Sequence, residues 1–157
     1  MKREPTPPAH CTFEPEDWLR LAKCWHPVAR ACDIGPAPVK ATLLDEQLVI
    51  YRINGQVVVA RDVCPHRGVP LTLGFHDEHG IICPYHGLRF GEDGRCNRIP
   101  SSPDQPVPAK LNLINFAVEE RFGLIWTCLA FDPDNPVPLP AMPHWDDDGF
   151  HQINCPA

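Results

Sequence analysis

The chain has 157 residues, 43% of them hydrophobic and 22% charged, a composition and length that fit one soluble globular domain with a core of its own. Its formal net charge of −6 argues against a nucleic-acid-binding surface. No apolar run approaches the roughly 20 residues that span a bilayer, and residues 1–10 lack the apolar stretch of a secretion signal. We therefore expect a cytoplasmic protein with no nucleic-acid partner and no membrane partner.

Eight cysteines raise the question of a disulfide-stabilised fold. Their spacing is irregular, and only Cys64 and Cys83 lie in a repeated pattern of Cys-Pro followed by His and Gly. Without a secretion signal, a disulfide framework is not expected. The other six are interpreted as free thiols that pack as small hydrophobic side chains: Cys11, Cys24, Cys32, Cys96, Cys128 and Cys155.

The N-terminal region predicts an irregular arm followed by a short helix. Residues 1–12 are rich in proline, which favours an arm without regular structure. Residues 15–23 begin with a proline and two acidic residues and end with a lysine, the pattern of a helix. Trp18, Leu21 and Ala22 fall at i, i+3 and i+4 and are expected to form its buried face.

The rest of the domain predicts strands. Residues 39–44, 47–52 and 56–61 are strand candidates, and Asn54-Gly55 is a strong hairpin signal between the last two. Shorter strands are expected at 71–75, 80–82 and 88–90. A final hairpin joins 113–119 to 122–128 around Glu120-Arg121, with Trp126 in the core. We expect an all-β domain over residues 13–131, followed by a Pro-rich exit segment over residues 132–157.

The strongest functional signal is a pair of short loops. Residues 64–68 read Cys-Pro-His-Arg-Gly and residues 83–87 read Cys-Pro-Tyr-His-Gly, with 16 residues between His66 and Cys83. Each loop offers one thiolate and one imidazole, and two cysteines with two histidines are the ligand set of a Rieske 2Fe–2S centre. We therefore predict that the cluster is bound by Cys64, His66, Cys83 and His86.

Neighbouring residues suit such a site. Gly68 and Gly87 close the two loops, where a backbone beside a cluster often needs φ values that a Cβ disfavours. Arg67, Tyr85 and Leu88 are candidates for contacts around the cluster or with a docking partner. For Arg67 and Tyr85, ordinary loop packing is an equal alternative.

A structural zinc site is the competing interpretation of the same residues. Zinc modules usually pair Cys with Cys and His with His at close spacing. Here each loop mixes the two residue types, and both loops carry Pro and Gly in matching places. The spacing therefore favours the iron–sulfur interpretation.

The two loops, with Gly87-Leu88-Arg89-Phe90 and Arg98-Ile99-Pro100 after them, resemble the Rieske domain of ring-hydroxylating and O-demethylating non-haem iron oxygenases. The likeness is strongest to the vanillate demethylase and phthalate dioxygenase branch and runs from about Trp18 to the Pro-rich exit. It implies an antiparallel β-sandwich with a small cluster-binding subdomain. It also implies that Cys64 and Cys83 hold one iron, while His66 and His86 hold the other.

Two departures separate the chain from respiratory Rieske proteins. Those proteins carry one further Cys in each loop, joined as a disulfide, whereas Val69 and Tyr85 stand at these positions here. They also place a Ser and a Tyr after the second loop as hydroxyl donors to the cluster, where this chain has Leu88 and Phe90. Fewer donors predict a potential at the low end of the Rieske range of about −150 to +300 mV.

The resembled oxygenases are longer chains, whose C-terminal domain binds a mononuclear Fe(II) through two histidines and a carboxylate. Their pattern, roughly D-x-x-H-x₄-H, does not occur here. His144 and His151, on either side of the acidic run 146–148, are interpreted as surface residues. We therefore expect part of an oxygenase or the product of a split gene, with no catalytic residue in this chain.

The leading interpretation is an electron-transfer domain. It would take single electrons from a reductase or ferredoxin and pass them through a histidine ligand to a mononuclear iron. In the resembled family that iron lies in a catalytic domain of the same or a neighbouring subunit, and the parent enzyme is a homotrimer. The alternative is a stand-alone Rieske ferredoxin, an electron carrier that catalyses nothing.

Overall fold

A computed structural model of the protein describes residues 5–151 and 153. The first residues of the predicted arm, the end of the predicted exit segment and Cys155 lie outside the described residues. The predicted all-β fold with a short N-terminal helix is confirmed. The elements are α1 (Pro15–Ala22), β1 (His26–Arg30), β2 (Val39–Leu43), β3 (Glu46–Ile53), β4 (Gln56–Arg61), β5 (Phe75–Asp77), β6 (Gly80–Ile82), β7 (Arg89–Phe90), β8 (Cys96–Arg98), β9 (Asn115–Arg121) and β10 (Leu124–Cys128), with short 3₁₀ turns η1 (Ala31–Asp33), η2 (Leu71–Leu73) and η3 (Ala109–Leu111).

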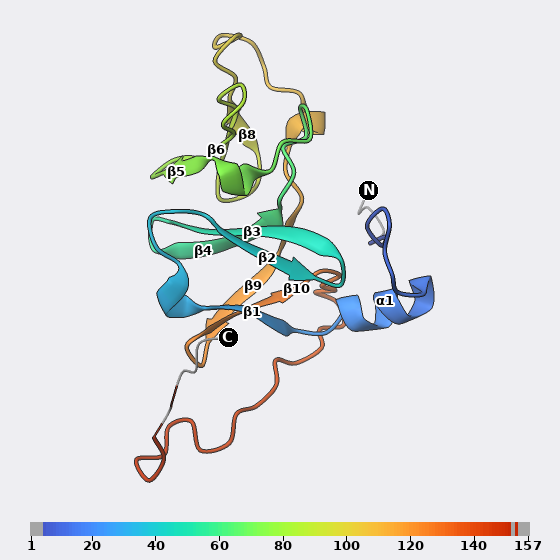
Figure 1. Ribbon diagram of the computed structural model, residues 1–157, viewed down its shortest axis with the longest axis vertical. Helices are drawn as coiled ribbons and strands as arrows, with labels where there is room; N and C mark the ends of the chain where they lie inside the picture. Colours follow the sequence, from blue (N-terminus) through green and yellow to red (C-terminus); the bar gives the residue numbers. More distant parts are fainter. Residues whose placement is uncertain (1–4, 152, 154–157) are drawn as a thin grey trace.

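The strands form two antiparallel sheets. The larger sheet has the order β1-β10-β9-β4-β3-β2, and the smaller has the order β5-β6-β7-β8. Figure 1 shows the larger sheet folded over, so that β2, β3 and β4 lie above β1, β9 and β10, with the smaller sheet standing above both. The smaller sheet is inserted in the chain between β4 and β9, and it carries the second of the two loops.

Strand β3 is buried on both faces, which fits its unbroken apolar run at residues 48–51. Successive side chains of a strand point to opposite faces. Leu48 and Ile50 therefore enter the core of the folded larger sheet, together with Ile125. Val49 and Tyr51 enter a second core, between the larger sheet and the smaller one. The two cores thus share β3, and they also share β4, which places Val58 and Ala60 in the second core and Val59 in the first.

Helix α1 packs through one turn only. Trp18 and Ala22 are 2% and 0% exposed, as predicted, and the indole N–H of Trp18 donates to the carbonyl oxygen of Leu44 at 3.0 Å. The prediction for Leu21 was wrong, because this side chain is 38% exposed. The hydrogen bond of Trp18 orients this eight-residue helix so that Trp18 and Ala22 face the sheet. Leu21 then lies at the edge of the contact, where solvent reaches it.

Two strands, β1 and β8, were not predicted from the sequence. Strand β1 contains Pro27 and pairs with β10 across a bulge between Pro27 and Ala29, so it lacks a clear alternation. Strand β8 has three residues, two of them exposed. In addition, residues 71–73, predicted as part of a strand, form the 3₁₀ turn η2, and the strand begins only at Phe75.

Two hairpin turns lie one or two residues from their predicted positions. Phe122 and Gly123 have φ of +58° and +68°, so the turn falls after Arg121 and not at Glu120-Arg121. Leu44 and Asp45 have φ of +49° and +65°, which places the β2–β3 turn one residue earlier than its predicted start at Asp45. Two consecutive residues at positive φ are typical of a type I′ turn, whose twist matches that of the flanking strands.

Figure 1 shows the segment after β10 as a long loop that extends below the larger sheet, and two aromatic residues of the domain contact it. The indole N–H of Trp25 donates to the carbonyl oxygen of Val137 at 3.0 Å, and the rings of Trp145 and Phe122 lie 5.3 Å apart. Among the described residues, no helix is both long enough and apolar enough to cross a membrane.

The core assignment predicts a contrast between two leucines. Leu48 is fully buried and Leu73 is 70% exposed. We expect Leu48→Ala to lower the free energy of unfolding by about 2–5 kcal/mol, because it leaves a cavity, and Leu73→Ala to change it by less than about 0.5 kcal/mol. Urea denaturation of both variants measures the difference. Equal losses would contradict the assignment of the core.

Candidate metal centre

The two loops have the same backbone hydrogen bonds. In the first loop, the N–H of Cys64 donates to the carbonyl oxygen of Val69 at 2.8 Å, and the N–H of Gly68 donates back to that of Cys64 at 2.8 Å. In the second, Cys83 and Gly87 repeat this pattern at 2.9 and 3.0 Å, with the carbonyl oxygen of Leu88 in the role of Val69. The histidine, however, stands third in one loop and fourth in the other.

Both loops close at a glycine with positive φ, +74° at Gly68 and +68° at Gly87, as the sequence predicts. Gly87 has a second constraint, because a Cβ there would lie 3.1 Å from Cγ of Pro100. The segment after β8 therefore packs directly on the second loop.

The four predicted ligands come together with thiols inside and imidazoles outside. Cys64 and Cys83 are 1% and 2% exposed, and both side chains belong to the same buried core. His66 and His86 are exposed, and their ring centroids are 4.7 Å apart. Two residue pairs that are distant in sequence thus form a single site with an apolar side and a solvent side.

Burial controls the chemistry of the thiols. It raises the pKa of the Cys64 thiol to about 11, against the backbone N–H groups of His66 and Arg67, which favour the thiolate. The neighbouring Cys83 thiol adds to the increase. A metal that binds here must therefore displace protons from the site.

The other predicted residues have distinct surroundings. The backbone N–H of Arg67 interacts with the Cys64 thiol, while its side chain is exposed. The ring of Tyr85 is 62% exposed and lies 3.9 Å from the ring of His86. Leu88 is buried at 3% exposure, and its side chain belongs to the same core as the two thiols.

A third segment borders the site, although no site residue was predicted in it. His66, His86 and Leu88 line a cavity of about 420 Å³ whose other wall is formed by Ile99, Pro100, Ser101 and Leu111. The single signal for this role in the sequence is the likeness of Arg98-Ile99-Pro100 to the Rieske oxygenases. Proline-rich loops lack the periodicity that would have revealed the contact.

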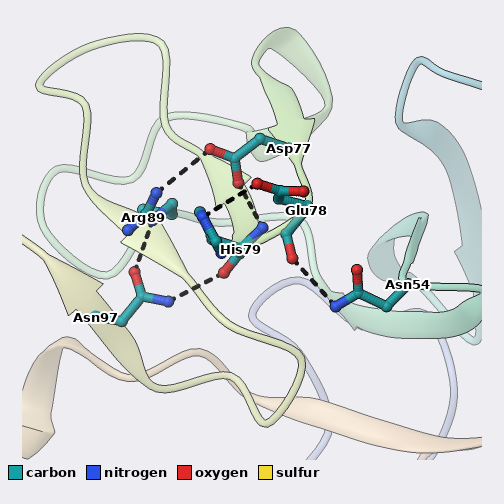
Figure 2. Close-up of polar contacts among 6 residues, drawn as sticks. All are labelled: Asn54, Asp77, Glu78, His79, Arg89 and Asn97. Carbon is teal, nitrogen blue, oxygen red and sulfur yellow. Dashed lines mark hydrogen bonds and ion pairs between the residues drawn. The ribbon is translucent and has the colours of Figure 1, made fainter.

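A polar network supports the base of the second loop (Figure 2). Arg89, one residue after Leu88, donates to Asn97 of β8 at 2.9 Å and to Asp77 of β5 at 3.3 Å. Asp77 also accepts from the N–H of His79 at 2.8 Å. One guanidinium thus connects both edge strands of the smaller sheet. Asn54, at the β3–β4 turn, donates to the carbonyl oxygen of Glu78 at 3.2 Å and connects the network to the larger sheet.

The comparisons identify the class of protein. The family model described as the Rieske [2Fe-2S] domain matches residues 24–114, and the chain belongs to this family. It is 40% identical to the methylxanthine N1-demethylase NdmA of Pseudomonas putida over 122 residues, 71% of this chain and 34% of that protein. It is 34% identical to the vanillate O-demethylase oxygenase subunit of Pseudomonas sp. (strain HR199 / DSM 7063) over 142 residues, 83% of this chain and 38% of that protein.

The solved structure of Pseudomonas putida CBB5 NdmA superposes with a TM-score of 0.76 and 33% identity, over 84% of this chain and 41% of that one. The chain thus spans less than half the length of these relatives. Its resemblance to the Rieske oxygenases is confirmed.

The residues at the loops fit the 2Fe–2S cofactor of the family. Among residues 5–151 and 153, no three His, Cys, Asp or Glu side chains converge on a position for one metal ion. A Rieske cluster does not need such a position, because each of its irons takes only two protein ligands. The two buried thiols and the two neighbouring exposed imidazoles match the two-cysteine, two-histidine donor set that such a cluster takes.

The packing around Gly87 predicts a contrast between two glycines. Gly55 has φ of +84° and nothing within 4 Å of an added Cβ, whereas Gly87 has φ of +68° and Pro100 at 3.1 Å. Both alanine variants should lose about 1–2 kcal/mol of unfolding free energy through backbone strain. Gly87→Ala should lose about 1 kcal/mol more, because Pro100 must move. Chemical denaturation of the two variants provides the test. Equal losses of unfolding free energy would show that Pro100 moves aside without measurable cost.

The network of Figure 2 predicts a pH dependence. Burial raises the pKa of Asp77, but the His79 N–H and the Arg89 guanidinium outweigh burial and hold this pKa below its ordinary value of 3.8. Ionised Asp77 therefore stabilises the fold above pH 3.8, and this contribution is lost as the pH falls through the lowered pKa.

We expect Asp77→Asn to remove up to about 1 kcal/mol of unfolding free energy at pH 7 and to flatten its decline below pH 4. Asp132→Asn is the matched control, because Asp132 accepts the N–H of Asp134 in the same kind of turn and pairs with no arginine among the described residues. Denaturation curves between pH 3 and 7 measure both. An identical pH profile for the two variants would contradict the assignment.

Proposed function

We propose that this chain is an electron-transfer domain of a Rieske non-haem iron oxygenase, with Cys64 and Cys83 as the ligands of one iron and His66 and His86 as those of the other. The observation that carries the proposal is the convergence of buried thiols and exposed imidazoles from two loops with the same backbone hydrogen bonds. When bound, a cluster of this kind supplies transfer of one electron at a time.

The residues around the site determine from which side an electron-transfer partner can approach it. Cys64 and Cys83 share a core with Val49 and Tyr51 of β3, so their side of the site is closed by protein. His66 and His86 are exposed, so a partner can approach only on the imidazole side. A ring N–H at this surface can donate a hydrogen bond to the partner. Electron entry and exit are therefore assigned to the histidines.

The partners follow from the family and the length of the chain. The donor is a reductase or ferredoxin, and the acceptor is a mononuclear iron in a catalytic domain of the same or a neighbouring subunit of a homotrimer. The oxygenase relatives extend well beyond the matched region, which gives room for such a domain. The described cysteines are all free thiols, which suits the reducing cytoplasm.

The surroundings of the second loop favour a low reduction potential. Leu88 and Phe90 are buried, at 3% and 0% exposure, and neither side chain can donate to a cluster sulfur. Donors to sulfur stabilise the reduced, more negative state. We therefore place the potential near the low end of the Rieske range of about −150 to +300 mV, as suits the reduction of an oxygen-activating iron.

A ligand substitution tests the proposal. The purified protein, reconstituted with iron and sulfide, is expected to be red-brown, with two irons and two sulfides per chain and an EPR signal on reduction. His86→Cys replaces a neutral ligand by an anionic one, so it should lower the reduction potential by at least about 100 mV, toward the potentials of all-cysteine clusters.

His79→Cys is the control, because its side chain is 60% exposed and lies in the β5–β6 turn, outside the two loops. It should leave the potential unchanged. A colourless protein that holds one zinc would overturn the proposal. A His86→Cys protein with the parent potential would remove His86 from the ligand set.

A further inference from the structure

A buried carboxylate lies at the entrance of the first loop. Asp62, between β4 and Cys64, is 3% exposed. Its Oδ1 accepts the backbone N–H of Thr72 at 2.8 Å, and its Oδ2 accepts the Thr72 hydroxyl at 2.7 Å. Among the described residues, no lysine or arginine pairs with it. A buried acid without a cation is costly unless hydrogen bonds hold it, so these two bonds are its whole compensation.

The contact closes the first loop. Thr72 lies in η2, after the loop, so one carboxylate ties the chain that enters the loop to the chain that leaves it. The N–H of Asp62 donates to the carbonyl oxygen of Gln47 at 2.8 Å, which fixes the same residue to β3. Asp62 thereby holds the exit of the loop against the larger sheet.

The segment that Asp62 holds also touches the second loop. Gly74 follows Thr72 by two residues, and a Cβ there would lie 2.1 Å from the carbonyl oxygen of Ile82 and 3.2 Å from Cδ of Pro84. This close approach leaves no space for a shift of residues 72–74 toward the second loop. The position of Thr72 therefore sets the separation of the two loops.

The two loops are held by different means. The base of the second loop depends on Arg89, whose side chain is 19% exposed and has Asn97 and Asp77 as partners (Figure 2). At the first loop, the side chain of Asp62 has only one partner residue among the described residues, Thr72, and it is more deeply buried, at 3% exposure. Loss of one hydrogen bond at Asp62 should therefore affect the site more than loss of one at Arg89.

We propose that Asp62 is a positioning residue of the iron–sulfur site: through Thr72 it fixes the distance between the loops, and with it the distance between the Cys64 and Cys83 thiols. This inference rests on the proposed function. Asp62 is not one of the four proposed ligands, and both its oxygens accept hydrogen bonds from Thr72.

The chain offers a matched control. Asp45 accepts the backbone N–H and the hydroxyl of Thr12, both at 2.7 Å, so it forms the same kind of Asp–Thr contact at an exposed turn of the larger sheet. The variants are Asp62→Asn and Thr72→Val at the site, and Asp45→Asn and Thr12→Val as controls. Each is reconstituted with iron and sulfide. The rate of iron release to a chelator, the EPR spectrum of the reduced cluster and its reduction potential are then measured.

We expect Asp62→Asn and Thr72→Val to release iron about tenfold faster than the parent, because each removes or reverses a hydrogen bond to a buried carboxylate. Their EPR g values should shift as the ligands reorient. The two control variants should match the parent in all three measurements. Thr72→Ser keeps both donors to Asp62 and should restore the parent rate and spectrum, which a general loss of packing at position 72 would not allow.

The outcomes separate this inference from the proposed function. A parent protein that binds no cluster overturns both. A parent that binds a cluster, with Thr72→Val and Asp62→Asn unchanged in release rate and spectrum, overturns only the role of Asp62. Equal effects in the Asp45→Asn control overturn it as well. If Asp62→Asn does not fold, Thr72→Val alone decides, since it keeps the volume and the backbone N–H of the residue.

Discussion

The burial of β3 on both faces is the constraint on which the rest of the molecule depends. One face, with Leu48 and Ile50, completes the core of the folded larger sheet. The other, with Val49 and Tyr51, is the floor on which the smaller sheet and the two thiols pack. Neither sheet could bury its apolar face alone at this size. The site is consequently built on a strand that is buried on both faces.

This arrangement explains the polarity of the metal centre. Packing on β3 excludes water from Cys64 and Cys83, which raises the pKa of the Cys64 thiol to about 11 and makes metal binding a proton-releasing event. The imidazoles lie on the far side of the same loops and stay in solvent. The orientation of the loops on the core therefore buries the two cysteines and leaves the two histidines accessible to solvent.

Much of the fold could be predicted from local signals. The Asn54-Gly55 hairpin, the apolar run of β3 and the glycines that close the loops each depend on chemistry within a few residues. The elements that were missed depend on distant partners. Strand β1 exists because β10 offers it an edge, and the exposure of Leu21 follows from the bond between Trp18 and Leu44. The contact of the segment at Pro100 with the second loop follows only from the position of Gly87 in the folded chain.

The sequence by itself determined the donor set and its family, because two Cys-Pro…His-Gly loops encode the chemistry of the site in consecutive residues, although the ligand roles stay a prediction. Tertiary structure alone decided how far apart the donors lie and what holds them there. The contacts Asp62–Thr72 and Arg89–Asp77 join residues 10 and 12 positions apart in the chain. No local pattern marks such pairs, because their partners are selected by the packing of two sheets on a shared strand.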